Sequence, residues 1–463
     1  MQVYKSSVLI GKVWINKLYV TLLVINCWST PVIEFVFHKQ PELERLLCIA
    51  FDIALDTATS MVLPFVIFYP YYANFNFLTY NFEIAYLYDD VWFANMVLEN
   101  QQVFALSFWD FAWKIIPHLS VFSCVGGVEA LVRQVRHQPR QVISATKAFD
   151  EAGNPTRTYE SKLGPNSISA VAPSVNNKTI FAGVTMVATQ RGILQRRGER
   201  VLKILHVLFF TWGLTVLALH LRAALKASSV DVPMCKQPTR PWFASNYSCS
   251  VLRFNCHRYN VSSVTDAHLE IIEDLSVIAL VFMHCRELRV PRHIQSFHNL
   301  LGVDIFNSTI VQWDTSAAIT NASHPILAYI IFVRVNMTAL PEGVLQQLPD
   351  TATDVEITMS NLTTLPADLH ERWHPMSIFY FEHSPATEFP ATLHHLHADD
   401  LSLIGTRIER LPEFESRQSG FYTLAMTHTP LRELPASMGN LATIGFLNLG
   451  YTQLSIFLSG WQP

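Results

Sequence analysis

The sequence predicts two structural classes in one chain: an α-helical membrane part, followed by a domain built from repeated, strand-bearing units. Three observations predict this. Long stretches of the amino-terminal half contain almost no charged residue, and positive charge is concentrated in one connecting stretch. The carboxyl-terminal half repeats a short apolar pattern at a nearly constant spacing. The 463 residues are enough for both regions.

The clearest membrane segment is the stretch 202–222. Its eighteen residues from Ile204 to Leu221 include no Asp, Glu, Lys or Arg, and that is about the length a helix needs to cross a hydrocarbon core. The other candidates lie within the membrane region, residues 1–132, at 46–71, at 115–132 and in the shorter stretch 18–33. Because the length of the last is marginal, three or four spans are both open.

The charge distribution predicts how these segments are oriented. Residues 131–201 carry eleven Lys and Arg against four acidic residues, whereas 74–102 carry acidic residues only. By the positive-inside rule the loop 133–201 is cytoplasmic, so 74–102 and everything after residue 222 lie outside. Four spans would also place Lys5, Lys12 and Lys17 outside, against the rule, while three would place them inside.

Glycosylation triplets agree with this orientation. Six Asn-x-Ser/Thr triplets lie beyond the last span, at Asn246, Asn260, Asn307, Asn321, Asn336 and Asn361. A seventh, at Asn177, falls in the cytoplasmic loop and is expected to stay unmodified. The repeat domain is therefore expected to be extracellular or luminal, in a protein of the plasma membrane or an endomembrane.

The cysteines divide in the same way. Three lie in apolar stretches, where cysteine behaves as a small buried hydrophobic residue. The other four cluster after the last span: Cys235, Cys249, Cys256 and Cys285. In an oxidising compartment they predict two disulfides, with three pairings open.

The carboxyl-terminal region is internally repeated when it is aligned on a Leu-Pro pair such as Leu340-Pro341 or Leu434-Pro435. Successive anchors are 22 to 27 residues apart. The positions ten and eight residues before the anchor are apolar in all eight units, a spacing that predicts a short strand with one buried face. The position five before it is mostly Ser or Thr, whose hydroxyl can bond to the backbone where the strand turns away.

This pattern resembles the leucine-rich repeat, with Ser or Thr where Asn is usual. The resemblance covers 269–463, about eight units, and implies a curved solenoid with a parallel sheet on its concave side. The whole layout resembles multi-pass leucine-rich-repeat membrane proteins of oomycetes. The residues that carry this resemblance are Trp212-Gly213, His220, Cys235, Pro241-Trp242, Cys249 and Asn255-Cys256. It implies that 235–268 forms a cap on the first repeat.

No nucleotide-binding glycine loop, nucleophile elbow, kinase signature or HExxH zinc motif is present, so we expect no enzymatic activity, catalytic residue or cofactor. One cluster could bind zinc or copper: His394, His395, His397, Asp399 and Asp400. A solvated turn of one repeat explains it better, and no metal site is predicted.

Four charged residues in or near the apolar segments are spaced four apart on a helix: Asp52 with Asp56, and Asp110 with Lys114. Charges within a membrane usually face a bundle interior and are paired. These residues predict a structural Asp–Lys clasp, with an ion or proton path and a misplaced segment boundary as alternatives.

The outward positions of the first five strands are largely apolar, where a solvent-facing sheet would carry polar residues. Such a patch predicts a binding surface. The alternatives are that it packs on the cap or on the membrane part, or that some repeats are aligned in the wrong register. The predicted ligand contacts are Phe306, Tyr329, Ile331, Val333 and Tyr380.

Together these features predict a non-enzymatic protein of the lipid bilayer, receptor-like or adhesive, that binds a protein or peptide ligand. No nucleic-acid partner is expected. Because no kinase domain follows, any signalling has to pass through a cytoplasmic partner of the loop 133–201. The alternative is a channel- or transporter-associated subunit with a leucine-rich-repeat ectodomain, which charged residues lining a pore would support.

Overall fold

The structure is a computed structural model that describes residues 2–137, 147–149, 155–157, 177–229, 232–414, 421–436 and 444–455. Residues 138–146, 150–154 and 158–176 of the basic loop 133–201 lie outside these residues. The chain divides into two compact units. Unit 1 comprises Met1–Val20, Leu63–Trp113 and Ala218–Pro463, and unit 2 comprises Thr21–Val62 and Lys114–Leu217.

Among the described residues, four helices are long and apolar enough to cross a membrane: Val13–Phe37, Pro41–Asn74, Phe108–Glu129 and Val201–Ser229. They belong to α2 (Val13–Phe37), α3 (Pro41–Thr57) with the π-helical turn η1 (Ala58–Val62) and α4 (Leu63–Asn74), α7 (Phe108–His137) and α8 (Asn177–Ser229). The marginal stretch 18–33 is the centre of the 25-residue helix α2. The structure thus has four candidate spans, the larger of the two counts that the sequence left open.

Within unit 2, helices α2 and α8 approach closely at Gly213. A methyl group there would lie 2.7 Å from Nε1 of Trp28, so only glycine leaves room for the indole. The Trp28 ring stacks on Phe210 with centroids 5.2 Å apart, and its Nε1 donates to the Phe210 carbonyl. The carboxylates of Asp52 and Asp56 form no ion pair among the described residues.

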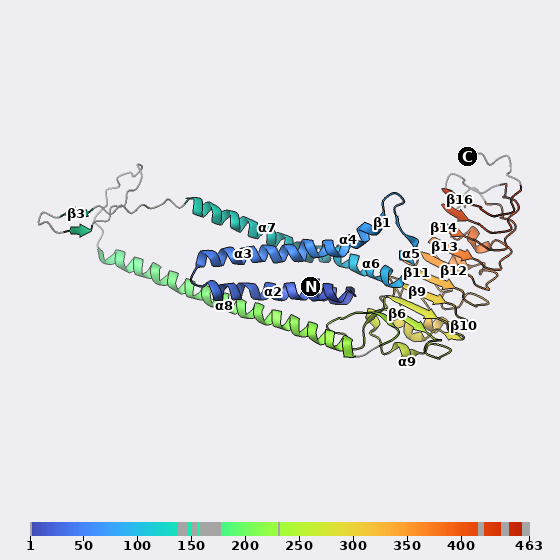
Figure 1. Ribbon diagram of the computed structural model, residues 1–463, viewed down its shortest axis with the longest axis horizontal. Coiled ribbons are helices and arrows are strands. Elements are labelled where there is room, and N and C mark those ends of the chain that lie inside the picture. Colours follow the sequence, from blue (N-terminus) through green and yellow to red (C-terminus); the bar gives the residue numbers. More distant parts are fainter. Residues whose placement is uncertain are drawn as a thin grey trace. The chain divides into compact units, whose positions relative to one another are not determined.

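Unit 1 is built on a ten-stranded sheet whose strands follow one another in chain order (Figure 1). The strands are β5 (Cys235–Pro238), β6 (Cys249–Asn255), β7 (Ala279–Met283), β9 (Gly302–Phe306), β11 (Tyr329–Val333), β12 (Asp354–Thr358), β13 (Met376–Glu382), β14 (Ala398–Ser402), β15 (Thr423–Ala425) and β16 (Phe446–Asn448). All neighbours are parallel except β5, which is antiparallel to β6. This confirms the predicted fold class, an apolar helical region followed by a parallel-sheet solenoid.

The two apolar columns of the repeat form the core. From Leu280 and Phe282 to Leu424 and Met426, all fourteen of these side chains are at most 2% exposed. Burying each contributes about 1.5–3 kcal/mol relative to leaving it in water. One face of every strand therefore fixes the register of the sheet, because a slip by one residue would turn the whole apolar set outward.

A left-handed residue lies six positions before each anchor, where the chain leaves the strand. These residues have φ between 45° and 67° and are His284, Asn307, Arg334, Met359, His383, Gly405, His428 and Tyr451. Only one of them is glycine, although this conformation costs other residues about 1–2 kcal/mol. Hydrogen bonds to the next repeat hold the turn: the Asn307 amide donates to Val333 O at 2.8 Å and the Arg334 amide to Thr358 O at 2.9 Å.

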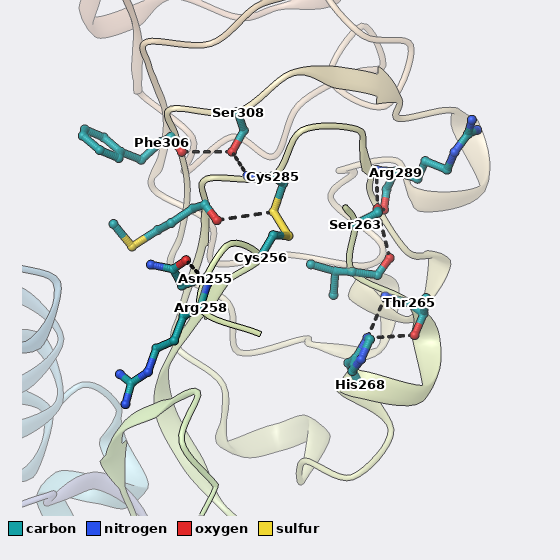
Figure 2. The surroundings of a disulfide bond; sticks show 12 residues. Asn255, Cys256, Arg258, Ser263, Thr265, His268, Cys285, Arg289, Phe306 and Ser308 are labelled. Carbon is teal, nitrogen blue, oxygen red and sulfur yellow. Dashed lines mark hydrogen bonds between the residues drawn. A yellow bond between two sulfur atoms is a disulfide. The ribbon is translucent and has the colours of Figure 1, made fainter. Parts of the chain in front are cut away.

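The residue after each left-handed residue, five positions before the anchor, is mostly Ser or Thr. Its hydroxyl bonds to the backbone, as the sequence predicted. Thr406 Oγ1 donates to Leu403 O at 2.9 Å, and Thr429 Oγ1 to Met426 O at 2.8 Å. Ser308 Oγ donates to Phe306 O at 2.9 Å and accepts from the Cys285 amide at 3.0 Å (Figure 2). These bonds occupy backbone groups that the end of the strand leaves free.

One disulfide lies within the cap and a second joins the cap to the first repeat. Cys235 is bonded to Cys249, which ties β5 to β6, and Cys256 is bonded to Cys285 (Figure 2). The second disulfide links the end of β6 to the end of β7. Strand β6 pairs with β7 in the repeat register. The cap therefore supplies the first parallel strand of the solenoid, one strand earlier than the sequence pattern indicated.

The amino-terminal residues belong to unit 1 and pair with acidic residues of two places, the segment between the second and third apolar helices and the start of the third. The segment contains α5 (Ile84–Leu87) and α6 (Asp90–Val103). Lys5 forms an ion pair with Asp110, and Lys12 with the fully buried Glu99 at 2.8 Å. Lys12 thus pairs with the acidic segment that the charge pattern predicted to lie outside, and Lys5 pairs with a residue in the first turn of α7.

Candidate ligand-binding surface

The residue nine positions before each anchor points away from the core, on the face that the repeat pattern predicted to be concave. The register places these residues side by side in one row: Arg253, Val281, Asp304, Ile331, Glu356, Tyr380, Ser402, Ala425 and Asn448. We call this sheet face the concave face. Apolar and acidic residues alternate in this row from Val281 to Glu356, and small or polar residues follow from Ser402 to Asn448.

Helix α6 covers part of the concave face next to the cap. Its Ala94 and Leu98 are buried with Val251, Ile278 and Ala279 in one apolar cluster. Figure 1 shows α5 and α6 beside β9 and β11. The small side chain of Ala279 lets the helix approach the sheet closely.

Glycine is required at position 302 by a neighbouring ring. A methyl group on Gly302 would lie 1.8 Å from Cζ of Tyr329, so the tyrosine lies directly across β9. The Tyr329 ring meets Phe93 of α6 edge to face, with centroids 5.6 Å apart, and is only 8% exposed. Tyr329 therefore packs between the sheet and α6.

Two polar contacts attach the start of α6 to the sheet. The Tyr88 hydroxyl donates to both oxygens of Glu356, at 2.7 and 2.9 Å. Arg253 of β6 forms an ion pair with Asp90 at 2.6 Å. Asp89 caps α6 by accepting from the amides of Val91 and Trp92, which fixes where the helix starts between these two contacts.

Between these contacts lies a cleft of about 290 Å³. Its lining combines Tyr88 and Asp90 with Arg253 and with side chains of three repeat strands, namely Val281, Met283, Asp304, Ile305, Phe306, Ile331 and Val333. The floor is apolar and one wall is acidic. The size and lining suit a side chain or a short peptide better than a folded partner.

Burial and like charges raise the pKa values of the carboxyl groups on this face. Burial, Glu356 and Asp400 raise the pKa of Asp354 to about 7. Burial raises that of Glu356 to about 7, with Glu382 and Asp400 adding to the rise and the Tyr88 hydrogen bond opposing it. Burial, followed by Asp90 and Glu356, raises the pKa of Asp304 well above its ordinary range. Burial and crowding therefore favour the protonated form of these carboxyl groups.

Each unit of 22 to 27 residues repeats the same three features. These are a parallel strand, a residue in the left-handed backbone conformation and a turn with a hydroxyl or similar small side chain. The carboxyl-terminal half is a leucine-rich-repeat domain. No protein-family model matches the chain, and no curated protein matches it.

Three solved structures resemble the chain. They are a leucine-rich-repeat protein of Leptospira interrogans (14% identity, TM-score 0.35, covering 46% of this chain and 57% of that one), the leucine-rich-repeat domain of the type III effector XopL (18%, 0.22, 38% and 70%) and a chain of the Toll–Spatzle complex of Drosophila (14%, 0.29, 49% and 42%). The chain thus spans just over half the length of the Leptospira protein.

The five residues predicted to contact a ligand occupy three different environments in the leucine-rich-repeat domain. Phe306, Ile331 and Val333 line the cleft. Tyr329 is buried and packs against Phe93 of α6. Tyr380 lies further along the row, partly exposed, and its hydroxyl donates to Asp400 at 3.0 Å.

The histidine cluster is not assembled around one point. The His395 ring lies against His370, with centroids 4.7 Å apart, and His394 lies against Phe389 and Phe414. Asp400 is engaged by Tyr380. Within the described ranges, no group of three or more metal-ligating side chains is placed to hold an ion.

The six glycosylation asparagines beyond the last span are all exposed on the leucine-rich-repeat domain and its cap. Two have side-chain hydrogen bonds that keep the amide near the surface: Asn246 Nδ2 donates to Glu270 O at 3.1 Å, and Asn361 Oδ1 accepts from the Met337 amide at 2.7 Å. The side chain of Asn177 lies outside the described residues.

Sequence reasoning missed the residues that complete the cleft, which are Tyr88, Asp90, Arg253 and Asp304. A signal for Asp304 was present, since an acidic residue stood in the outward row among apolar ones. For Tyr88 and Asp90 there was none, because nothing local in residues 84–103 indicates which distant strand they contact.

Proposed function

We propose that the chain is a non-enzymatic integral membrane protein, receptor-like or adhesive, whose leucine-rich-repeat domain binds a protein or peptide ligand outside the cytoplasm. The observation that carries the proposal is the cleft on the concave face. Three predicted contacts, Phe306, Ile331 and Val333, line it together, and the ordered segment 84–103 forms its opposite wall. A preformed, partly apolar cleft lowers the entropy cost of binding a flexible ligand.

The proposed orientation rests on four spans. An even number of crossings places the amino terminus and the repeats on the same side, as the contacts of the first residues with the cap require: the Arg240 amide donates to Ser7 O at 3.3 Å. The charge rule opposed four spans because of the amino-terminal lysines. Two of these are paired with carboxylates, Lys5 with Asp110 and Lys12 with Glu99, which weakens that objection.

Selection from a phage-displayed library of random peptides, against the full chain in phosphatidylcholine nanodiscs, tests the proposal. We expect enriched peptides whose binding is lost when Phe306→Ser and Ile331→Ser are combined, while the disulfides and the unfolding temperature are retained. Tyr451→Ser is the matched control, because Tyr451 is 83% exposed and lies outside the cleft. Peptides that bind the double variant as well as the wild type, or the absence of any peptide that responds to it, would contradict peptide binding at this face.

One observation favours the alternative of a channel- or transporter-associated subunit. Asp52 and Asp56 share one side of α3 and form no ion pair among the described residues, and a π-helical turn follows them at Ala58–Val62. Unpaired membrane carboxylates and π-turns are both frequent at functional sites. Ion flux in liposomes that Asp52→Asn and Asp56→Asn abolish would establish this function; flux that never exceeds empty liposomes would reject it.

A further inference from the structure

The cleft has an acidic wall that its own residues do not neutralise. Among the described residues that line it, Arg253 is the one cation, and that cation is paired with Asp90. Asp304 faces the same space from β9, and Glu356 closes the neighbouring edge through its bonds to Tyr88. When their carboxyl groups are ionised, Asp90, Asp304 and Glu356 outnumber the single cation Arg253.

Two buried polar atoms of the residues that line the cleft have no hydrogen-bond partner among the described residues, Nε of Arg253 and Oδ2 of Asp304. Oδ2 of Asp304 is buried and makes no hydrogen bond to any described residue. A buried carboxylate oxygen without a donor costs about 1–3 kcal/mol or more, so native proteins rarely leave one unless something else satisfies it. The raised pKa of Asp304, caused first by burial and then by Asp90 and Glu356, agrees with this lack of a cation.

The apolar floor of the cleft lies directly beside Asp304. Ile331 is the register neighbour of Asp304 on β11, and Val333 is the neighbour of Phe306. Any occupant that brings a cation to Asp304 therefore also contacts aliphatic and aromatic surface. Inorganic cations satisfy only the first requirement, whereas a basic side chain flanked by apolar ones satisfies both.

We propose that this cleft binds an Arg or Lys side chain of the ligand, with its cationic group at Asp304 and its apolar neighbours on Phe306, Ile331 and Val333. The inference rests on the proposed peptide-binding function and names its ligand class. The occupant touches Tyr88 and Asp90 as well as the repeats, so the site is composite. Both the repeats and the segment 84–103 contribute to affinity.

The same geometry sets the pH dependence of binding. The groups that face Asp304 are Tyr88, Asp90, Arg253, Tyr329, Asp354 and Glu356. A cation binds the ionised carboxyl and therefore displaces a proton wherever Asp304 is protonated in the free protein. Affinity for a basic peptide then rises with pH, by at most about tenfold per pH unit for one proton released.

The test uses the full chain in zwitterionic phosphatidylcholine nanodiscs and fluorescein-labelled peptides from the selection described above. Each peptide is made twice, with Arg and with citrulline, which keeps the shape of the side chain but not its charge. We expect the citrulline form to bind the wild type about tenfold or more weaker, and both forms to bind Asp304→Asn equally. Asp350→Asn is the control, since Asp350 is exposed outside the cleft and its removal should preserve the preference for Arg.

A second variant guards against loss of folding in Asp304→Asn. Ile331→Lys places a cation from the protein itself beside Asp304, so it should block the Arg peptides and raise the unfolding temperature. If Arg and citrulline peptides bind the wild type alike, if Asp304→Asn keeps the preference for Arg, or if Ile331→Lys binds Arg peptides as the wild type does, the ligand class is wrong. Peptides that lack a basic residue but still lose binding with Phe306→Ser would overturn this inference while leaving the proposed function intact.

Discussion

The Tyr88 hydroxyl donates to both carboxylate oxygens of Glu356, across 268 positions of sequence. Tyr88 lies in the segment that joins α4 to α7, and Glu356 lies in β12 of the leucine-rich-repeat domain. The contact therefore connects the concave face to a segment that continues, at both ends, into candidate membrane helices. A ligand in the adjacent cleft touches both sides of this connection.

Tyr88→Phe should loosen α5 and the start of α6 from the sheet. The substitution removes the only hydroxyl donor that the described residues offer to the buried Glu356 carboxylate, at a cost of about 1–2 kcal/mol. Amide hydrogen exchange in residues 84–103 should become roughly tenfold faster. Tyr86→Phe is the control, because Tyr86 stacks on Trp92 and its hydroxyl makes no hydrogen bond among the described residues. Equal exchange in the two variants would show that the hydroxyl contributes nothing.

The stability of unit 1 should fall as pH rises from about 4 to about 7. Carboxyl groups of an unfolded chain titrate near pH 4, whereas those of Asp354 and Glu356 have pKa values of about 7 in the fold. In that window the folded chain holds more protons than the unfolded chain, so each increase in pH favours unfolding. The unfolding temperature should be higher at pH 5 than at pH 8. In the double variant Asp354→Asn, Glu356→Gln, the difference between these two unfolding temperatures should become smaller. Asp368→Asn, on an exposed Arg372 pair, should leave it unchanged. An unfolding temperature that rises with pH would refute the raised pKa values of these two carboxyl groups.

Peptide mass spectrometry without reduction should recover Cys235 linked to Cys249 and Cys256 linked to Cys285. Replacing both Cys256 and Cys285 with Ser should destabilise the domain by about 2–4 kcal/mol, because the cap has little core of its own to hold its strand in place. Cys124→Ser, in an apolar helix, controls for the loss of a thiol elsewhere. Reaction of all four cap thiols with maleimide in unreduced, denatured protein would disprove the pairing.

Glycan mapping should find modification only on the carboxyl-terminal side of the last span. All six acceptors there are exposed: Asn246, Asn260, Asn307, Asn321, Asn336 and Asn361. We expect a glycosidase to lower the apparent mass, and protease added to sealed membranes to remove the repeats. Modified Asn177 with six bare acceptors would reverse the orientation.

The sheet could be predicted from the sequence because its register is set within each repeat. The columns that contain Leu280 and Phe282 are apolar in every unit, and only one alignment buries both. The role of the Ser/Thr position could also be predicted, since the hydroxyls of Thr406 and Thr429 bond to carbonyl groups three residues earlier. Patterns whose cause lies within a few residues of the same segment can therefore be interpreted from the sequence alone.

The cover on the concave face could not be predicted in the same way. Periodicity shows that Tyr329 points away from the core, but it does not show that Phe93, more than two hundred residues earlier, packs on it. The left-handed turn was equally hidden. His284, Met359 and Tyr451 share no chemistry at that position, since the constraint comes from backbone bonds to the next repeat rather than from the side chain.

The construction of unit 1 from three separated stretches of chain has a consequence for biosynthesis. Ser7 and Lys12 leave the ribosome among the first residues, whereas Arg240, the partner of Ser7, is made only after the last apolar helix. The unit therefore cannot close during synthesis of its first stretch. Until β6 and β7 have been synthesised, the apolar side of α6 lacks the surface of Val251 and Ala279 on which it packs, and nascent chains with such exposed surfaces are the usual clients of chaperones.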